Sequence, residues 1–141
     1  MENRSPLLTA HYAEKAYDFL QGMKLLAEYD LAVHRASIGL LATHSAIALN
    51  DAILTSVRGK SSKAEDHSEA ARELERVCSE LKIEKRHGVR HLSSLLKKKN
   101  LIAYGDQRIE DNDVKSAIDQ AERFANWAYI HFKEVLGARE S

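Results

Sequence analysis

The chain has 141 residues, and its 21 Lys and Arg balance its 21 Asp and Glu to a formal net charge of zero. This length suits one domain with a sizeable core, and the balance excludes a uniformly basic nucleic-acid coat and an acidic solvating tail. Only 6% of the residues are aromatic, and the chain has six Gly and one Pro. This composition favours long helices over many short strands.

The first two helices are predicted from apolar spacing and end signals. Residues 8–28 repeat apolar groups every three or four positions, which indicates an amphipathic helix. Asp30 is a candidate N-cap for a second helix that runs to about Arg58, where Gly59 supplies a stop. Because this second helix is apolar on much of its circumference, we expect it to be the central helix.

The remaining helices follow in the second half of the chain. Ser62 and Glu65 fit a capping box, so a third helix is expected to start near Lys63. Gly88 is expected to interrupt it, and a short fourth helix follows, with residues 99–112 as a loop. Asp111 or Asn112 is expected to cap a last helix that reaches about Leu136. The whole chain, residues 1–141, is therefore predicted to be a single all-α domain, an up-and-down bundle of four to five helices.

No stretch approaches the roughly 18 uninterrupted apolar residues of a membrane span. The first fifteen residues lack the apolar segment of a signal peptide. The single cysteine, Cys78, excludes an intrachain disulfide and a cysteine-cluster metal site, and it fits a reducing compartment. We therefore expect a soluble cytoplasmic protein with no membrane partner.

The neutrality of the chain hides one basic segment. Residues 82–105 carry seven Lys or Arg and one Glu, a net charge of +6. Lys97, Lys98 and Lys99 are expected to end the fourth helix, where cations complement the helix dipole. The helix dipole does not explain Arg90, because this residue is near the other end of the helix. The alternative is a surface that binds the phosphates of a nucleotide or RNA, with Tyr104 available for stacking on a base.

Two polar residues lie on an otherwise apolar stripe of the second helix. His44 and Asp51 share this stripe with Leu40, Ile47 and Leu54. One interpretation is that both side chains find partners across the bundle and fix its register. The other is a polar pocket, joined by His67, in which a histidine titrates near neutral pH and serves as acid or base.

The sequence gives little support for a metal site. Glu84 and His87 form the only E-x-x-H pattern, and His87 and His91 are four residues apart. Both histidines stand among Lys85, Arg86 and Arg90, whose positive charge opposes a cation. We therefore expect a solvated basic face, with no metal and no cofactor.

The segment KKKNLIAYGDQRIEDNDVKSAIDQAERFANWA resembles the HEPN superfamily, the higher eukaryotes and prokaryotes nucleotide-binding domain. In that family a short polar motif precedes a last helix of small residues and a phenylalanine, which here are Ala117, Ala121 and Phe124. The segments THSAIALNDAI and GKSSKAEDHSEA look like the second helix and following loop of small bacterial members. The likeness covers residues 32–132 approximately.

The resemblance implies a helical bundle that forms a homodimer and acts in a toxin–antitoxin or defence system, often beside a nucleotidyltransferase. The ribonuclease members use an R-x(4–6)-H motif, in which Arg stabilises phosphate charge and His does acid–base work. Here Lys99 stands at the Arg position, Asn100 follows it, and Tyr104 stands at the His position. Lysine lacks the bidentate fork of arginine, and tyrosine, with a pKa near 10, is a poor base at neutral pH.

These departures favour a non-catalytic binding module over an enzyme. The residues expected to contact a nucleotide, RNA or partner protein are Arg90, Lys97, Lys99, Asn100, Tyr104 and Asp106. The alternative is a divergent, metal-independent ribonuclease that uses His44 or His67 as base, while Lys99 and Arg90 bind phosphate. Asp51 is the third candidate catalytic residue.

Overall fold

The computed structural model describes residues 2–62 and 67–137, with the backbone alone at His67 and Ser68. Within these residues the chain forms six helices and no strand, which confirms the predicted all-α bundle. The helices are α1 (Pro6–Asp30), α2 (Arg35–Arg58), α3 (His67–Leu81), α4 (Arg86–Tyr104), α5 (Asp111–His131) and α6 (Lys133–Leu136). The first five are long, and α6 is a single turn.

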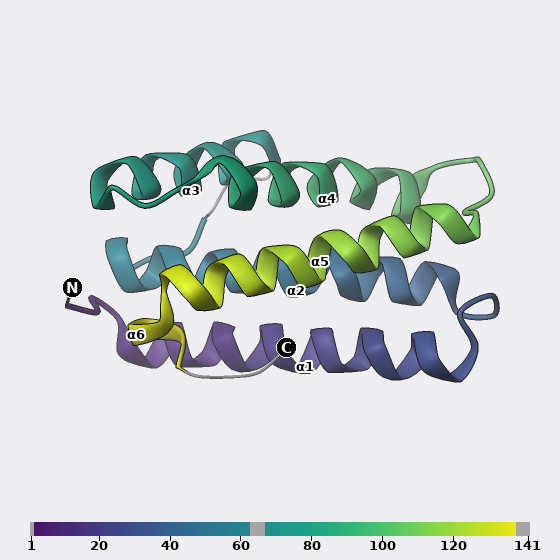
Figure 1. Cartoon of the computed structure of the whole chain (residues 1–141), viewed down its shortest axis with the longest axis horizontal. Helices are drawn as coiled ribbons and strands as arrows, with labels where there is room; N and C mark the ends of the chain where they lie inside the picture. Colours follow the sequence, from purple (N-terminus) through teal and green to yellow (C-terminus); the bar gives the residue numbers. More distant parts are fainter. Residues whose placement is uncertain (1, 63–66, 138–141) are drawn as a thin grey trace.

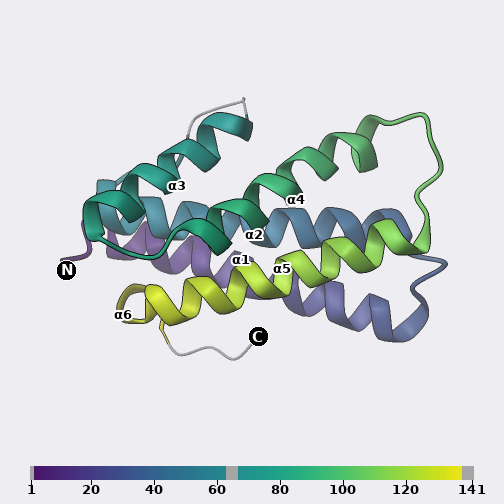
Figure 2. The same cartoon turned by 45° about the horizontal axis from the view of Figure 1, so that its top comes forward.

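The long helices lie roughly parallel or antiparallel to one another (Figure 1). The chain reverses direction between α1 and α2, between α3 and α4, and between α4 and α5, whereas α2 and α3 run in the same direction (Figures 1 and 2). The chain after Gly59 therefore turns back along α2. The backbone N–H of Ser62 donates to the Asp51 carboxylate at 3.2 Å, so this connection returns by about two helical turns.

Helix α2 is the central helix, as its sequence predicts. Among the described elements it contacts all five other helices. It is 24 residues long, and an 18-residue stretch of it has a mean hydropathy of 1.3, so it is long and apolar enough to cross a membrane, but 72% of that stretch is buried within the bundle. That burial is what the core helix of a soluble bundle requires.

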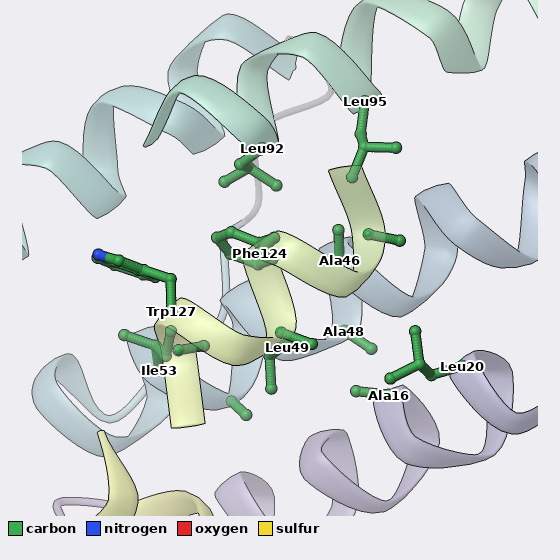
Figure 3. Packing of buried hydrophobic residues seen from close by; sticks show 14 of the residues in the cluster. Ala16, Leu20, Ala46, Ala48, Leu49, Ile53, Leu92, Leu95, Phe124 and Trp127 are labelled. Carbon is green, nitrogen blue, oxygen red and sulfur yellow. The ribbon is translucent and has the colours of Figure 1, made fainter. Parts of the chain in front are cut away.

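The core combines small residues, mainly alanines of α1, α2 and α5, with larger apolar side chains from the same helices and from α4. Ala16 and Leu20 of α1 meet α2, while Leu92 of α4 and Phe124 of α5 fill the opposite side (Figure 3). The apolar spacing of the last helix predicts a buried stripe of Val114, Ala117 or Ile118, Ala121, Phe124 or Ala125, Ala128, Phe132 and Val135. These residues are buried except for Ile118 and Val135, which are half-buried.

The turn between α1 and α2 corrects the predicted N-cap. Asp30 is the last residue of α1, and its carboxylate accepts a hydrogen bond from the Val33 N–H at 3.3 Å within the turn. The residue that precedes α2 is His34. The predicted stop is confirmed, because Gly59 adopts a left-handed conformation with φ of 80° and its N–H donates to the Thr55 carbonyl.

Gly88 does not interrupt a helix, contrary to the prediction. It is buried in the first turn of α4, directly under the indole of Trp127 on α5, where an added Cβ would collide with the ring. The indole Nε1–H also donates to the Glu84 carbonyl at 2.8 Å, just before α4 begins. Glycine is required here by close helix packing, so α4 has 19 residues and the predicted short helix was wrong.

The ends of the last helix also differ from the prediction. The residue that precedes α5 is Glu110, whose N–H donates to the Asp113 carboxylate at 2.9 Å in a capping box, rather than Asp111 or Asn112. The helix ends at His131, and Phe132 separates it from α6. The predicted third-helix start at Lys63 and the capping residue Glu65 lie outside the described residues.

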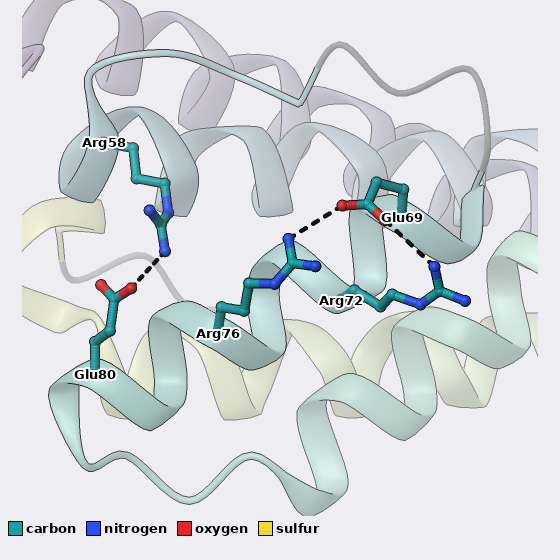
Figure 4. A network of polar contacts seen from close by, with 5 residues as sticks. All are labelled: Arg58, Glu69, Arg72, Arg76 and Glu80. Carbon is teal, nitrogen blue, oxygen red and sulfur yellow. Dashed lines mark hydrogen bonds and ion pairs between the residues drawn. The ribbon is translucent and has the colours of Figure 1, made fainter.

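Helix α3 presents its charged face to solvent. Glu69 accepts from Arg76 at 3.1 Å and from Arg72 at 3.4 Å, both along α3 (Figure 4). Glu80 accepts from Arg58, at the end of α2, at 2.7 Å. These are exposed pairs, and such pairs contribute little to stability. The apolar residues of α3 therefore hold it on α2 and α4.

Candidate ligand-binding site

A pocket of about 380 Å³ lies where α2, α3 and α4 meet. This volume is in the range of small-molecule sites, which cluster between helices in bundles. The pocket combines an apolar wall with several polar groups. Its lining residues are Ile47, Asn50, Asp51, Ser62, Ala70, Leu92, Leu96, Lys99, Asn100 and Tyr104.

Asp51 is the acidic group of this pocket. Its Oδ1 accepts the Ser62 N–H at 3.2 Å. Burial raises the pKa of the carboxyl from 3.8 to about 6, against the lowering effect of the Ser62 hydrogen bond. Of the two charged side chains that act on it, Glu73 of α3 raises the pKa further and Lys15 of α1 lowers it. Asp51 is therefore a carboxyl that titrates close to neutral pH.

Asn50, next to Asp51, has an unsatisfied buried acceptor. The residue is only 2% exposed, and its Oδ1 has no hydrogen-bond partner. It is the only such side-chain atom found in the described part of the chain. A buried polar atom without a partner costs about 1–3 kcal/mol, so this atom is a local cost in the packing around α2.

The α4 side of the pocket holds three of the residues singled out by their sequence. Lys99, Asn100 and Tyr104 line it, and they lie on the last turns of a helix instead of in the predicted loop. Because α4 continues to Tyr104, Lys97 to Lys99 are not in its last turn and do not serve as its dipole partners. Tyr104 is 81% exposed, so its ring stands at the rim.

Three consecutive lysines of α4 face three different environments, since successive residues of a helix point about 100° apart. Lys97 is exposed to solvent. Lys98 donates to Ser116 Oγ at 2.9 Å and to Gln120 Oε1 at 2.8 Å on α5. Lys99 lines the pocket. Only the third of these cations is placed to meet a ligand there.

The structure leaves three predicted contact residues outside the pocket. Arg90 and Lys97 are exposed on α4, seven residues apart and therefore on one face, which is not the face of Lys99. Asp106 is exposed in the connection between α4 and α5. The basic segment 82–105 is thus divided among separate surfaces.

The structure places one of the two candidate histidines, His44, outside the pocket. His44 is half-buried on α2, with its ring 6.0 Å from that of Phe19, and it does not line the pocket. Burial lowers its pKa, and the positive charges of Lys99 and Lys15 lower it further. His44 is therefore a neutral imidazole at neutral pH. The side chain of His67 lies outside the described residues.

The remaining candidate groups are engaged in the structure of the bundle. Glu84 accepts the N–H of His87 at 3.1 Å, at the start of α4, and its carboxylate lies 3.5 Å from the His87 imidazole. Among the described residues no group of three or more His, Cys, Asp or Glu could hold a metal ion. Cys78 is buried, and burial raises the pKa of its thiol to about 11, which disfavours the reactive thiolate.

No known protein family, curated protein or solved structure matches the chain. The assignment of function therefore depends on the pocket itself. Reasoning from the sequence identified Asp51, Lys99, Asn100 and Tyr104 but missed Asn50 and Ser62. The position of Asn50, one residue before Asp51 in an otherwise apolar helix, is the signal that could have found it.

Proposed function

We propose that this chain is a non-catalytic binding module that holds a nucleotide in the pocket between α2, α3 and α4. The single observation that carries the proposal is that one pocket is lined by the Asp51 carboxyl, by Lys99 and by Tyr104. A bound molecule with hydrogen-bond donors, a negative charge and a flat ring meets all three groups.

The rim of the pocket supports a nucleotide in particular. Lys99 brings a positive charge that suits a phosphate, and Tyr104 is an exposed aromatic ring on which a base can stack. The described residues offer Lys99 no ion pair. Leu92 and Leu96 provide an apolar wall beside these groups. A planar, donor-bearing ring with a phosphate attached matches this set of groups.

Binding accounts for this site better than the ribonuclease alternative. Cleavage of RNA needs a base close to the phosphate that Lys99 would hold. His44 does not line the pocket, the side chain of His67 lies outside the described residues, and Arg90 lies on another face of α4. Asp51 is the candidate base that lines the pocket. Cleavage of a mixed RNA pool by the pure protein, lost in His44→Ala, His67→Ala or Asp51→Asn, would favour the alternative.

The HEPN resemblance of the sequence supports a proposal for the cellular role of the module. The resemblance supports a cytoplasmic homodimer that works in a toxin–antitoxin or defence system, with a nucleotidyltransferase-type protein as the class of partner. RNA is the larger ligand that the same groups suit. Light scattering tests the dimer, and a monomer at all concentrations would contradict it.

The proposal is tested by calorimetric titration of the full chain with each of the four common nucleoside monophosphates. We expect at least one to bind, and Lys99→Glu to weaken it about tenfold or more, because the phosphate then faces a negative charge. The matched control is Lys97→Glu, the same charge change two residues away on another face. Equal losses in both variants would mean that net charge, not the pocket, holds the ligand.

A further inference from the structure

The floor of the pocket presents one hydrogen-bond acceptor, the carboxyl of Asp51. Asp51, once ionised, has only acceptor atoms, and within the described residues its one hydrogen bond is the 3.2 Å contact from the Ser62 N–H to Oδ1. Its Oδ2 receives no donor from those residues. The part of a ligand that reaches this floor must therefore carry donors.

The chemistry of this carboxylate narrows the pattern of donors. A carboxylate is best satisfied by two parallel N–H groups, as in its pairing with arginine. A ligand that fits this floor therefore presents two adjacent N–H donors to Asp51.

Among nucleobases, guanine has this arrangement. Its Watson–Crick edge carries N1–H beside the 2-amino group, which provides two further hydrogens. Adenine and cytosine place a single amino group beside a ring nitrogen acceptor, and that acceptor would face the Asp51 carboxylate. Uracil has one N–H between two carbonyl oxygens. The minor-groove edge of a G·C pair is distinguished by the same 2-amino donor.

We infer that the pocket selects guanine, because the Asp51 carboxylate accepts from N1–H and from the 2-amino group. The inference rests on the proposed function, since in both proposals Lys99 holds the phosphate and Tyr104 stacks on the base. Guanine selection is a specific property of the floor, whereas nucleotide binding as such depends on the rim. The two can therefore fail separately.

Guanosine and inosine monophosphates provide the direct test, because inosine monophosphate lacks only the 2-amino group. Calorimetry of the unmodified full chain at about pH 8 keeps Asp51 ionised. We expect guanosine monophosphate to bind about tenfold or more tightly than the inosine form, since hydrogen bonds to a charged acceptor are lost. Adenosine monophosphate should bind more weakly still.

A variant of the floor tests the assignment to Asp51. Asp51→Asn keeps an oxygen that accepts the Ser62 N–H but replaces the other acceptor with an amino donor. We expect the preference for guanosine over inosine monophosphate to fall to about twofold or less. Glu73→Gln is the control, because Glu73 acts on Asp51 through its charge without lining the pocket, and it should keep the preference.

The outcomes separate the two proposals. Equal affinity for guanosine and inosine monophosphates, still lost in Lys99→Glu, would overturn the guanine inference and leave nucleotide binding intact. A preference that survives in Asp51→Asn would overturn the assignment to this carboxylate. No binding of any nucleoside monophosphate would overturn the proposed function and the inference with it. The comparison on the unmodified chain decides the inference even if the variant does not fold.

Discussion

The two faces of α4 differ in how completely their polar groups are satisfied. Toward α5 the contact is closed: Gly88 lies against Trp127, the indole N–H has a carbonyl partner, and Lys98 donates to two side chains. Toward α2 the same helix leaves a pocket, and Asn50 on its far side has an acceptor without a partner among the described residues. One face is closed by its own side chains, and at the other we propose that a ligand binds.

The largest expected effect comes from opening the closed face. Trp127→Ala removes a side chain that is only 6% exposed, together with its hydrogen bond to the Glu84 carbonyl. We expect the free energy of unfolding to fall by about 3–5 kcal/mol, as for other buried aromatic truncations. Urea unfolding followed by circular dichroism measures it.

The control for this prediction is Tyr104→Ala on the open face, where the ring is 81% exposed. This change should alter the free energy of unfolding by about 0.5 kcal/mol or less. Similar losses in the two variants would remove the distinction between the faces.

The second effect comes from overfilling the closed face. Gly88→Ala places a methyl group against the Trp127 indole, and we expect the protein to lose about 1–3 kcal/mol of stability. Gly22→Ala is the matched control inside α1, where the new Cβ would lie 3.5 Å from Leu41 Cδ1 in ordinary contact. That variant should gain about 0.5–1 kcal/mol, because alanine favours the helix. Thermal unfolding should therefore give shifts of opposite sign.

The smallest effect concerns the open face and depends on pH. The pKa of Asp51 is raised from 3.8 to about 6 in the folded protein, so the folded state favours the protonated carboxyl. The contribution of this group to the free energy of unfolding is therefore fully present below about pH 4 and is lost as pH rises through about 6. At about pH 8, Asp51→Asn should be more stable than the unmodified protein by about 1–2 kcal/mol, after allowance for solvent screening. Near pH 4 the two should be similar.

Urea unfolding at both pH values measures this difference, and the exposed Asp106→Asn serves as the control, with a change of about 0.5 kcal/mol or less. A stability difference between Asp51→Asn and the unmodified protein that is the same at both pH values would show that Asp51 does not titrate in this range.

Much of the fold could be predicted because it depends on local patterns. The apolar stripe of α5, the central role of α2 and the left-handed Gly59 are all determined by residues close in sequence. Gly88 was misread because the reason for a glycine inside a helix is Trp127, 39 residues further on. Without that contact, glycine indicates a helix break.

The site could be predicted in part for the same reason. The stripe of α2 identified Asp51, and charge with an aromatic residue identified Lys99 and Tyr104. Arg90 and Lys97 could be excluded from the pocket only once the length of α4 was known. Because this helix continues to Tyr104, the cations along it face different directions, and only some of them face the pocket. Asn50 was missed because an unpaired atom is a property of three-dimensional packing.

The length of α4 decides which side chain stands at the rim of the pocket. One residue added before Lys97 would rotate every later side chain of α4 by about 100° relative to its first turns. With Gly88 held under Trp127, the chain could keep its charge and most of its helices. Lys98 would then take the place of Lys99, so a cation would still line the pocket, but Ala103 would take the place of Tyr104 and the rim would lose its ring. Among homologues, α4 is therefore expected to keep a constant length between Gly88 and Tyr104 wherever the ligand is kept.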